Sequence, residues 1–289
     1  MLSVKDFNMK LLSLRNTRKL TKTMKMVSAT KLRRATEAVK YTDDYADPLR
    51  RIVARVARGE DALAHILMRP RLPVRQVLVV MATSEKGLCG GFNNNLFRIL
   101  HPWMEQRTAE GQATAVSLYG RRGCMMYRNR VTVRHNYQSS GARPEYADAW
   151  RVALDVQHDF VSDRVQEVYL AYNRFGSAMS QKPAIERLLP FACVTDPAVA
   201  DAQADPLVEP DSEALLAAIL PQMIGLRIFL ALLHSAAGEH GARMTAMDAA
   251  TTNADKLINE TALLRNRARQ AAITRELAEI ISGSEALKG

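Results

Sequence analysis

The two ends of this chain almost lack the residues that interrupt helices. Residues 1–58 contain no glycine and a single proline, Pro48, and residues 242–282 contain neither residue. Both stretches are rich in Ala, Leu, Met, Lys, Arg and Glu, which favour helices. The pattern predicts two helices of about 55 and 75 residues, and helices of that length need a partner to bury their apolar side chains. This need constrains every fold open to the chain.

The C-terminal stretch carries a heptad pattern. Apolar and small residues recur there in two rows with a period of seven, Ala250, Leu257, Leu264, Ala271 and Ala278, and Met247, Ala254, Thr261 and Ala268. The N-terminal stretch has a helical apolar stripe, Leu20, Met24, Val27, Leu32, Ala35 and Val39. Heptad spacing with small residues is typical of closely packed coiled coils. The two ends are therefore predicted to form an antiparallel coiled coil, with the middle of the chain reversing its direction.

The middle of the chain alternates between short Val-rich runs and helical patterns. The runs predict strands over residues 76–83, 113–119, 165–172 and 184–194. Helical patterns lie between them near residues 93–108, 120–128 and 145–163. Such alternation predicts an α/β unit with a largely parallel sheet. The predicted organisation is an N-terminal helix (1–58), an α/β domain (59–208) and a C-terminal helix (209–289).

Positive charge is concentrated at the N-terminus. The chain has a formal net charge of +10, and residues 1–58 hold fifteen Lys and Arg against five Asp and Glu. A basic helix of this kind suits an anionic partner: a nucleic acid, an acidic protein surface or anionic lipid headgroups.

An apolar stretch over residues 214–237 approaches the length of a transmembrane helix. It contains Pro221, Gln222, Arg227 and His234, and a charged residue is costly in lipid. The stretch is therefore predicted to be a helix buried by protein. The N-terminus is charged and lacks the apolar segment of a signal peptide.

Residues 84–93 (SEKGLCGGFN) are the most conspicuous motif, because they follow the first predicted strand directly. Such turns bind phosphate in many α/β proteins, but this one matches neither GxxxxGK[ST] nor GxGxxG. A tight turn packed against its neighbours is predicted instead. Cys89 within it lacks a base placed nearby by the sequence, so it is not predicted to be a nucleophile.

The cysteines and histidines indicate no other chemistry. Cys89, Cys124 and Cys193 are widely spaced without a CxxC pair, so each is predicted to be a small buried residue in a reducing compartment. No metal-binding motif is present. No catalytic residue, cofactor or metal site is predicted.

Four blocks, in order along the chain, resemble the gamma subunits of F-type ATP synthases of bacterial type. They are residues 14–35 (LRNTRKLTKTMKMVSATKLRRA), 87–96 (GLCGGFNNNL), 242–254 (ARMTAMDAATTNA) and 266–283 (NRARQAAITRELAEIISG). The resemblance implies an antiparallel coiled coil of the two ends and a Rossmann-like α/β domain between them. It also implies the function of a central-stalk rotor, which couples rotation of the c ring to ATP synthesis or hydrolysis in the alpha–beta hexamer without being a catalyst itself.

The resemblance further implies partners and contact residues. The partners are the alpha and beta subunits, the epsilon subunit and the c ring, at the cytoplasmic face of the bacterial plasma membrane, with no nucleic acid. Met24 and Lys25 match the position that contacts a moving acidic loop of the beta subunit. Positions tied to coupling or to the inner loops of the hexamer match Arg243, Arg269, Gln270, Thr274 and Glu279. Glu209 matches the foot near the c ring.

Two other interpretations remain open from the residues alone. The basic N-terminal helix is compatible with a nucleic-acid-binding coiled-coil protein, which would bind DNA or RNA in a salt-dependent way. The glycine-rich turn is compatible with an α/β nucleotide-binding enzyme, which would have a saturable site at residues 87–93.

Overall fold

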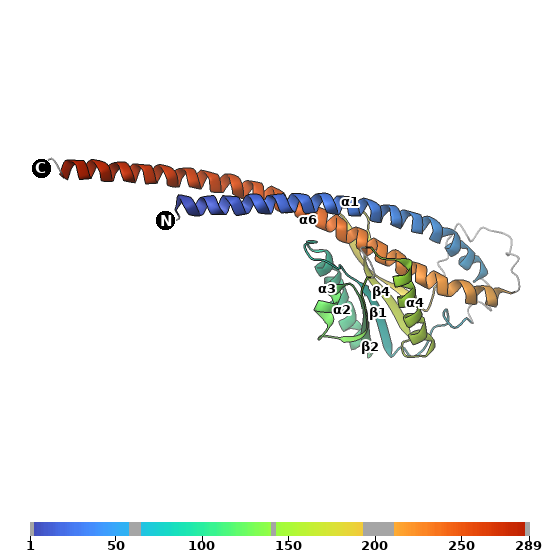
Figure 1. The fold of residues 1–289 in the computed structure, drawn as a ribbon. Helices are drawn as coiled ribbons and strands as arrows, with labels where there is room; N and C mark the ends of the chain where they lie inside the picture. Colours follow the sequence, from blue (N-terminus) through green and yellow to red (C-terminus); the bar gives the residue numbers. More distant parts are fainter. Residues whose placement is uncertain (1–2, 58–64, 140–142, 193–210, 287–289) are drawn as a thin grey trace. The chain divides into compact units, whose positions relative to one another are not determined.

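The computed structural model describes residues 3–57, 65–139, 143–192 and 211–286. They form two compact units, residues 28–243 and a smaller unit drawn from residues 1–27 and 244–289. Figure 1 draws the helices and strands and labels most of them. Their bounds are α1 (Val4–Val56), β1 (Gln76–Ala82), α2 (Phe92–Ala109), β2 (Ala113–Tyr119), α3 (Arg121–Tyr127), β3 (Thr132–Tyr137), α4 (Tyr146–Val161), β4 (Glu167–Phe175), β5 (Gln181–Leu189) and α6 (Ser212–Ala286).

The larger unit is built on one five-stranded sheet in the order β3-β2-β1-β4-β5. Strand β1 pairs in parallel with β2 on one side and with β4 on the other, and β3 continues the parallel part. Strand β5 returns antiparallel to β4 at the edge. The predicted α/β class with a largely parallel sheet is therefore confirmed.

The alternation of side chains along β1 decides which helices cover which face of the sheet. Val77, Val79 and Met81 pack with α2, whereas Leu78 and Val80 pack with α4 and α6. Every residue of β1 after Gln76 is buried, as expected for a central parallel strand that is covered on both faces. The sheet is thus the middle of three layers.

The first part of α6 is a core helix. By length and composition, α6 is apolar enough to cross a membrane. Its apolar side chains are nevertheless buried within the larger unit, among them Leu216, Leu220, Met223, Ile224 and Ile228. The predicted burial of this stretch by protein is confirmed for these side chains.

The second half of the N-terminal apolar stripe packs as predicted. Val39 forms a cluster with Leu233 and Ala237 of α6, and Leu32 and Ala35 pack against that cluster. The division of the chain at residues 58 and 208 stays a prediction, because both positions lie outside the described residues.

In the smaller unit, α1 and α6 pair antiparallel. Arg18 forms an ion pair with Asp255 and Lys25 forms one with Asp248, each with an N–O distance of 2.6 Å. Between them, the Thr251 hydroxyl donates to the Thr21 hydroxyl at 2.8 Å. Residue numbers rise on one helix as they fall on the other, which confirms the antiparallel arrangement.

The seam of this pair differs from the predicted one by a single position. The row Met247, Ala254 and Thr261 is buried, as predicted. Leu257 and Leu264 are 46% and 48% exposed, so the row that contains them is wrong. The second row of the seam lies one residue later in the sequence than predicted, and it begins at Thr251.

Two of the three residues that the N-terminal stripe has in this unit are exposed, while Met24 is half-buried. Leu20 is 64% exposed and Val27 is 50% exposed. The buried positions are Leu11 and Thr21, and they alternate with half-buried ones such as Leu14. Apolar composition alone misplaced the seam because large apolar side chains lie on the outer surface while Thr and Ala lie inside.

Two strands differ from the sequence prediction. Strand β3 (TVRHNY) was missed because it is a polar edge strand with no fully buried residue. Strand β5 was predicted over residues 184–194, but it begins at Gln181 and ends at Leu189. Its polar start, which includes Pro183, lies at the sheet edge, where proline is tolerated.

The corrected seam predicts opposite results for two matched substitutions. We expect Ala254→Glu to destabilise the helix pair by about 2 kcal/mol, because it buries a carboxylate at a 4% exposed position. Leu257→Glu should cost less than about 0.5 kcal/mol in the isolated full-length chain. Thermal unfolding followed by circular dichroism, with limited proteolysis of residues 1–27, measures both. Equal destabilisation by the two variants would contradict the corrected seam.

Candidate functional site: the turn after β1, its clamp on α6, and the helix pair

The turn after β1 is held on α6 by one buried ion pair. Arg243 donates from Nε to the carbonyl of Gly87 and from Nη2 to the carbonyl of Lys86, both at 3.1 Å. Its Nη2 also contacts Glu239 Oε1 at 2.5 Å, and the other carboxylate oxygen of Glu239 accepts from the Glu85 amide at 3.2 Å. The two side chains are 8% and 11% exposed. We call Glu239, Arg243 and these three backbone groups the Arg243 clamp.

Hydrogen bonds within the turn fix its shape. The Ser84 amide donates to Asn93 Oδ1 at 3.1 Å, and Asn93 Nδ2 donates to the Ser84 hydroxyl at 2.8 Å. Leu88 and Gly90 adopt positive φ angles, 63° and 55°, inside this loop. The prediction of a tight turn packed against its neighbours is confirmed.

Helix α6 occupies much of the crevice where α/β proteins bind nucleotides. That crevice lies beyond the carboxyl ends of the parallel strands, where β1 is flanked by β2 and β4. The Ser235 hydroxyl donates to the carbonyl of Ala82, the last residue of β1, at 3.3 Å. A Cβ at Gly238 would lie 2.8 Å from the ring of Phe92, the first residue of α2. The glycine-rich turn therefore serves to seat a helix.

Cysteine 89 is a small buried residue in this turn, as predicted, and is 3% exposed. Its thiol lies 3.7 Å from the Ser84 hydroxyl and 3.9 Å from the Lys86 carbonyl. Cys124 is half-buried and accepts from Asn136 Nδ2 at 3.2 Å. Cys193 lies outside the described residues. Among the residues that the structure describes, no group of His, Cys, Asp and Glu could hold a metal ion.

His240 is surrounded by cations next to the clamp. Its Nδ1 lies 3.3 Å from Arg243 Nη1, a contact that the neutral ring can accept. Burial, together with the positive charges of Arg243, Lys31 and Lys86, lowers the pKa of His240 to about 4. The ring is therefore neutral near pH 7.

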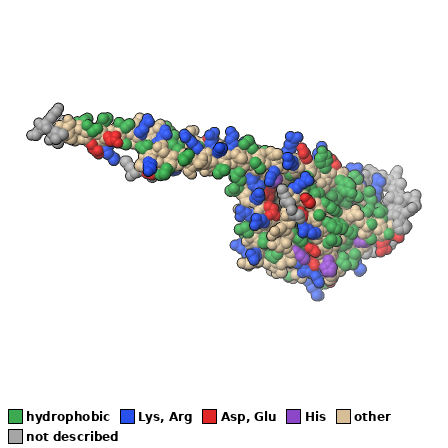
Figure 2. Space-filling view, in the orientation of Figure 1, with side chains coloured by type: hydrophobic (Ala, Val, Ile, Leu, Met, Phe, Trp, Pro, Cys, Tyr) green, Lys and Arg blue, Asp and Glu red, His purple; other side chains and the backbone are tan. Residues whose placement is uncertain are grey.

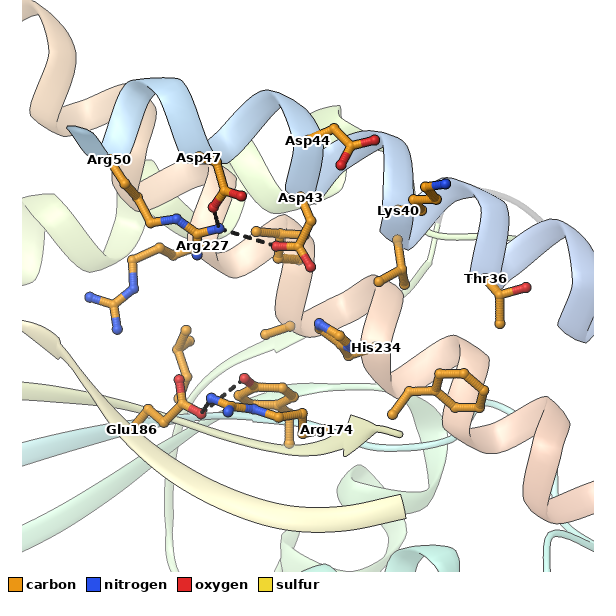
Figure 3. Close-up of a pocket in the computed structure, with 16 residues that line it drawn as sticks. Thr36, Lys40, Asp43, Asp44, Asp47, Arg50, Arg174, Glu186, Arg227 and His234 are labelled. Carbon is orange, nitrogen blue, oxygen red and sulfur yellow. Dashed lines mark hydrogen bonds and ion pairs between the residues drawn. The ribbon is translucent and has the colours of Figure 1, made fainter. Parts of the chain in front are cut away.

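A second polar region is an open cavity of about 780 Å³ between α1, α6 and the β4–β5 hairpin. Figure 3 shows Arg50 turned toward Asp43 and Asp47, and Arg174 turned toward Glu186. Each of these ion pairs stays within one helix or one hairpin. The cavity is lined by charges of both signs, so it has no net preference for an anion or a cation.

The predicted contact residues fall in two places. Met24 and Lys25 are half-buried on α1, and Lys25 is held toward α6 by its ion pair with Asp248. Arg269, Gln270, Thr274 and Glu279 are exposed on α6. Glu209 lies outside the described residues. Arg243 is separate from all of them, because it is buried in the clamp.

The last part of α6 extends past the start of α1. The pairs Lys25–Asp248 and Arg18–Asp255 place the first residue of α1, Val4, opposite position 269 or so. Beyond that point, no described part of α1 covers α6. Exposed apolar side chains nevertheless continue along one stripe of the helix, namely Ile273, Leu277, Ile280 and Ile281.

Sequence reasoning missed Glu239, which completes the clamp. It lies four residues before Arg243, the spacing at which opposite charges meet on one helix face. That spacing was visible in the sequence. Its burial was not, because the burial depends on a turn more than 150 positions away in the chain.

Comparison with known proteins agrees with this architecture. The family model described as ATP synthase matches residues 3–287. The ATP synthase gamma chain of Geotalea daltonii is 43% identical over 291 residues, which cover 100% of both chains. The gamma chain of Anaeromyxobacter dehalogenans is also 43% identical, over 99% of each chain.

Two solved structures share the fold at low identity. The rotor of the Euglena gracilis mitochondrial ATP synthase matches with a TM-score of 0.64 and 20% identity, over 93% of this chain and 98% of that one. The central stalk and c ring structure of the Tetrahymena thermophila enzyme matches with a TM-score of 0.60 and 22% identity, over 80% and 99%.

An antiparallel helix pair together with an α/β domain is thus the fold of rotor subunits in rotary ATP synthases. Identity over the full length narrows the class further: the chain belongs to the ATP synthase gamma chain family. The gamma chain is a non-catalytic subunit of the F-type enzyme and the rotor of its central stalk. This family membership replaces the interpretations of the chain as a nucleic-acid-binding coiled-coil protein and as a nucleotide-binding enzyme.

The clamp predicts a large loss of stability when one of its charges is removed. We expect Arg243→Gln to lower the free energy of unfolding by about 3–5 kcal/mol, because Glu239 is left buried and unpaired. Arg174→Gln, which breaks the more exposed Arg174–Glu186 pair, should cost less than about 1 kcal/mol. Urea unfolding followed by the fluorescence of Trp103 and Trp150 measures the larger unit. A loss no larger than that of Arg174→Gln would contradict the clamp.

His240 predicts how stability depends on pH. Its pKa is lowered in the folded chain, so the unfolded chain binds more protons between about pH 6.5 and 4. The stability due to the neutral ring is full above pH 6.5 and falls as the pH drops through this window, by about 2 kcal/mol. His240→Gln should flatten this part of the profile. An unchanged difference in stability between pH 7 and pH 4.5 in the variant would show that other groups cause the dependence.

Proposed function

We propose that this chain couples rotation of a membrane-embedded c ring to the catalytic cycle of an alpha–beta hexamer. The tip of α6 would turn inside the hexamer, the α/β domain would sit nearer the membrane with the epsilon subunit, and the complex would lie at the cytoplasmic face of the bacterial plasma membrane. Family membership supports this proposal, and so do the following features of the two units.

The uncovered tip of α6 is the observation that carries the proposal. A single helix of about 17 residues is marginal in water even when its sequence favours helix. The tip also exposes Ile273, Leu277 and Ile280 along one stripe, at 48%, 55% and 67%. A stripe of this kind needs a protein surface around it. A surrounding hexamer would supply that surface and could bind Arg269, Gln270, Thr274 and Glu279 on the same helix.

The surface of the helix pair suits an acidic surrounding partner. Figure 2 shows Lys and Arg side chains distributed along the paired helices among apolar ones. Lys25 and Arg18 form ion pairs with Asp248 and Asp255, so their positive charge is partly neutralised within the helix pair. Met24 has no charge and is half-buried next to Lys25. The proposed contact with an acidic loop of the beta subunit therefore falls on a region where part of the positive charge is already neutralised by Asp side chains.

The Arg243 clamp would transmit torque between α6 and the α/β domain. Torque carried along α6 must enter the α/β domain if both are to turn together. The apolar contacts of α6 with the sheet resist separation, but hydrogen bonds of fixed direction also resist sliding. Arg243 supplies two such bonds to the turn after β1, and Glu239 accepts a third from it, close to the point where α6 leaves the larger unit.

The test of the proposal is reconstitution of the catalytic assembly. Full-length chain is co-expressed with the alpha and beta subunits of the same organism, and the products are separated by size-exclusion chromatography. We expect a stable complex that contains a single copy of this chain and hydrolyses ATP faster than alpha and beta without it. A chain that elutes alone while alpha and beta behave normally would refute the proposed role.

Met24→Lys should weaken coupling without preventing assembly. A second cation beside Lys25 would strengthen attachment to an acidic beta-subunit loop and so resist rotation. We expect ATP-driven ion pumping per ATP hydrolysed to fall several-fold, measured in membrane vesicles containing the complete complex. Met24→Leu, which keeps size and apolarity, is the matched control. Unchanged pumping in Met24→Lys would contradict the proposed contact.

A further inference from the structure

The crevice at the carboxyl ends of β1, β2 and β3 is only partly filled by α6. A cavity of about 360 Å³ remains beside the turn, at the size where small-molecule sites begin. It is lined by residues from the ends of all three strands and the start of α3: Glu85, Gly87, Gly120, Arg121, Arg122, Cys124, Met125, Asn136, Tyr137 and Gln138. The clamp uses backbone groups of Glu85 and Gly87 from the same turn, but the side chains of Glu239 and Arg243 do not line this cavity.

Two guanidinium groups face this cavity without a carboxylate partner among the described residues. Arg121 and Arg122 form none of the ion pairs of the described chain. Arg122 lies against the turn after β1. Its amide donates to the Ser84 carbonyl at 3.2 Å, and its Nη2 would lie 2.1 Å from a Cβ at Gly87. Glycine at position 87 is thus what allows the guanidinium to lie against the turn. Paired guanidinium groups match the geometry of a phosphate group.

The surroundings add positive charge. A smaller cavity of about 150 Å³ lies across Glu85, and Lys31, Lys86 and Arg143 are among the residues that line it. Within the described residues, none of these three cations has an ion pair. Of the two carboxylates that line it, Glu239 is held by Arg243. The region between the two cavities therefore has an excess of positive charge, which favours an anion.

Glu85 supplies a hydrogen-bond acceptor beside the arginines. Its Oε1 is buried and accepts no hydrogen bond from the described residues. Its backbone amide is fixed by Glu239, so the residue is held in place. A buried carboxylate oxygen without a donor is costly, and rotation of the Glu85 side chain into the cavity that it lines would allow a hydroxyl group of a ligand to donate to it. Acidic residues at the carboxyl edge of parallel sheets bind ribose hydroxyls in this way in dinucleotide-binding folds.

We propose that this cavity binds a phosphate ester of a small polyhydroxylated molecule, such as a sugar phosphate or the ribose phosphate part of a nucleotide. Arg121 and Arg122 bind the phosphate, and the free oxygen of Glu85 accepts from a hydroxyl of the sugar. Met125, which is 73% exposed, forms an apolar wall of the cavity for the organic part. The inference concerns the α/β domain alone and does not depend on the rotor function.

Isothermal titration calorimetry of the purified full-length chain tests the proposal with three probes: inorganic phosphate, ribose 5-phosphate and ADP. We expect ribose 5-phosphate to bind saturably, with a Kd at or below about 1 mM, and inorganic phosphate to bind at least about tenfold more weakly. Tighter binding of ADP than of ribose 5-phosphate would identify a nucleotide as the source of the phosphate ester. No saturable binding of either ester at about 10 mM would overturn the proposal.

Variants separate the two halves of the site. Replacement of Arg121 and Arg122 together by Gln should weaken every probe at least about tenfold, because two charge-assisted hydrogen bonds are lost. The matched control replaces Arg128 and Arg130, two exposed arginines that do not line the cavity, and should leave binding unchanged. An equal loss in the control would mean that the net charge of the chain binds the anion, and would overturn the site.

Glu85→Gln tests the proposed hydroxyl contact. It should weaken ribose 5-phosphate about tenfold while binding of inorganic phosphate stays the same or improves, since a negative charge is removed. Met125→Glu, at an exposed position outside the clamp, should weaken all probes by repulsion and leaves the fold intact. Loss of inorganic phosphate binding in Glu85→Gln to the same extent as ribose 5-phosphate would contradict the assigned role of Glu85.

Discussion

The structure depends on the burial of one apolar helix. The first part of α6 is so apolar that it can be stable only if covered on most sides, and the α/β sheet supplies that cover. Leu220, Met223 and Ile224 are almost fully buried there. At about 2 kcal/mol per fully buried side chain, this face of α6 contributes far more than the ion pairs on the surface of the molecule. Directional contacts such as the Arg243 clamp then decide which register of the helix on the sheet is kept.

The use of α6 as a core element explains the state of the crevice. In an open α/β sheet the space beyond the carboxyl ends of the strands is free for a ligand. Here Gly238 brings α6 close enough to touch Phe92, and Ser235 satisfies the end of β1. The Glu85 amide, which could donate to a phosphate in a nucleotide-binding protein, donates to Glu239 instead, and the carbonyls of Lys86 and Gly87 accept from Arg243. A helix that replaces a ligand leaves the fold unchanged but makes the domain part of a rigid mechanical unit.

Most of the fold was predicted from the lengths of the stretches that lack glycine and proline, because these two residues interrupt helices. The central strands were predictable for a similar reason: β1 is buried on both faces and reads as an uninterrupted apolar run. Strand β3 and the start of β5 escaped because edge strands carry polar residues, so no hydrophobic period marks them. The tight turn was predicted from its glycines, whereas Glu239 and the unpaired oxygen of Glu85 depend on contacts that only the folded chain creates.

The error in the helix seam has a physical cause that also bears on function. Sequence reasoning assigns the largest apolar side chains to the interior, yet Leu257 and Leu264 face outward while Ala254 and Thr261 face inward. A pair of helices that buried its leucines would be self-sufficient and would present a polar surface. This pair instead holds itself together with small residues, a Thr21–Thr251 hydrogen bond and two exposed ion pairs. Each of these contributes on the order of 1 kcal/mol or less, so the pair on its own is only weakly held together. Its apolar surface therefore remains available for contact with a surrounding protein. A rotor shaft that turns inside a hexamer requires such a surface.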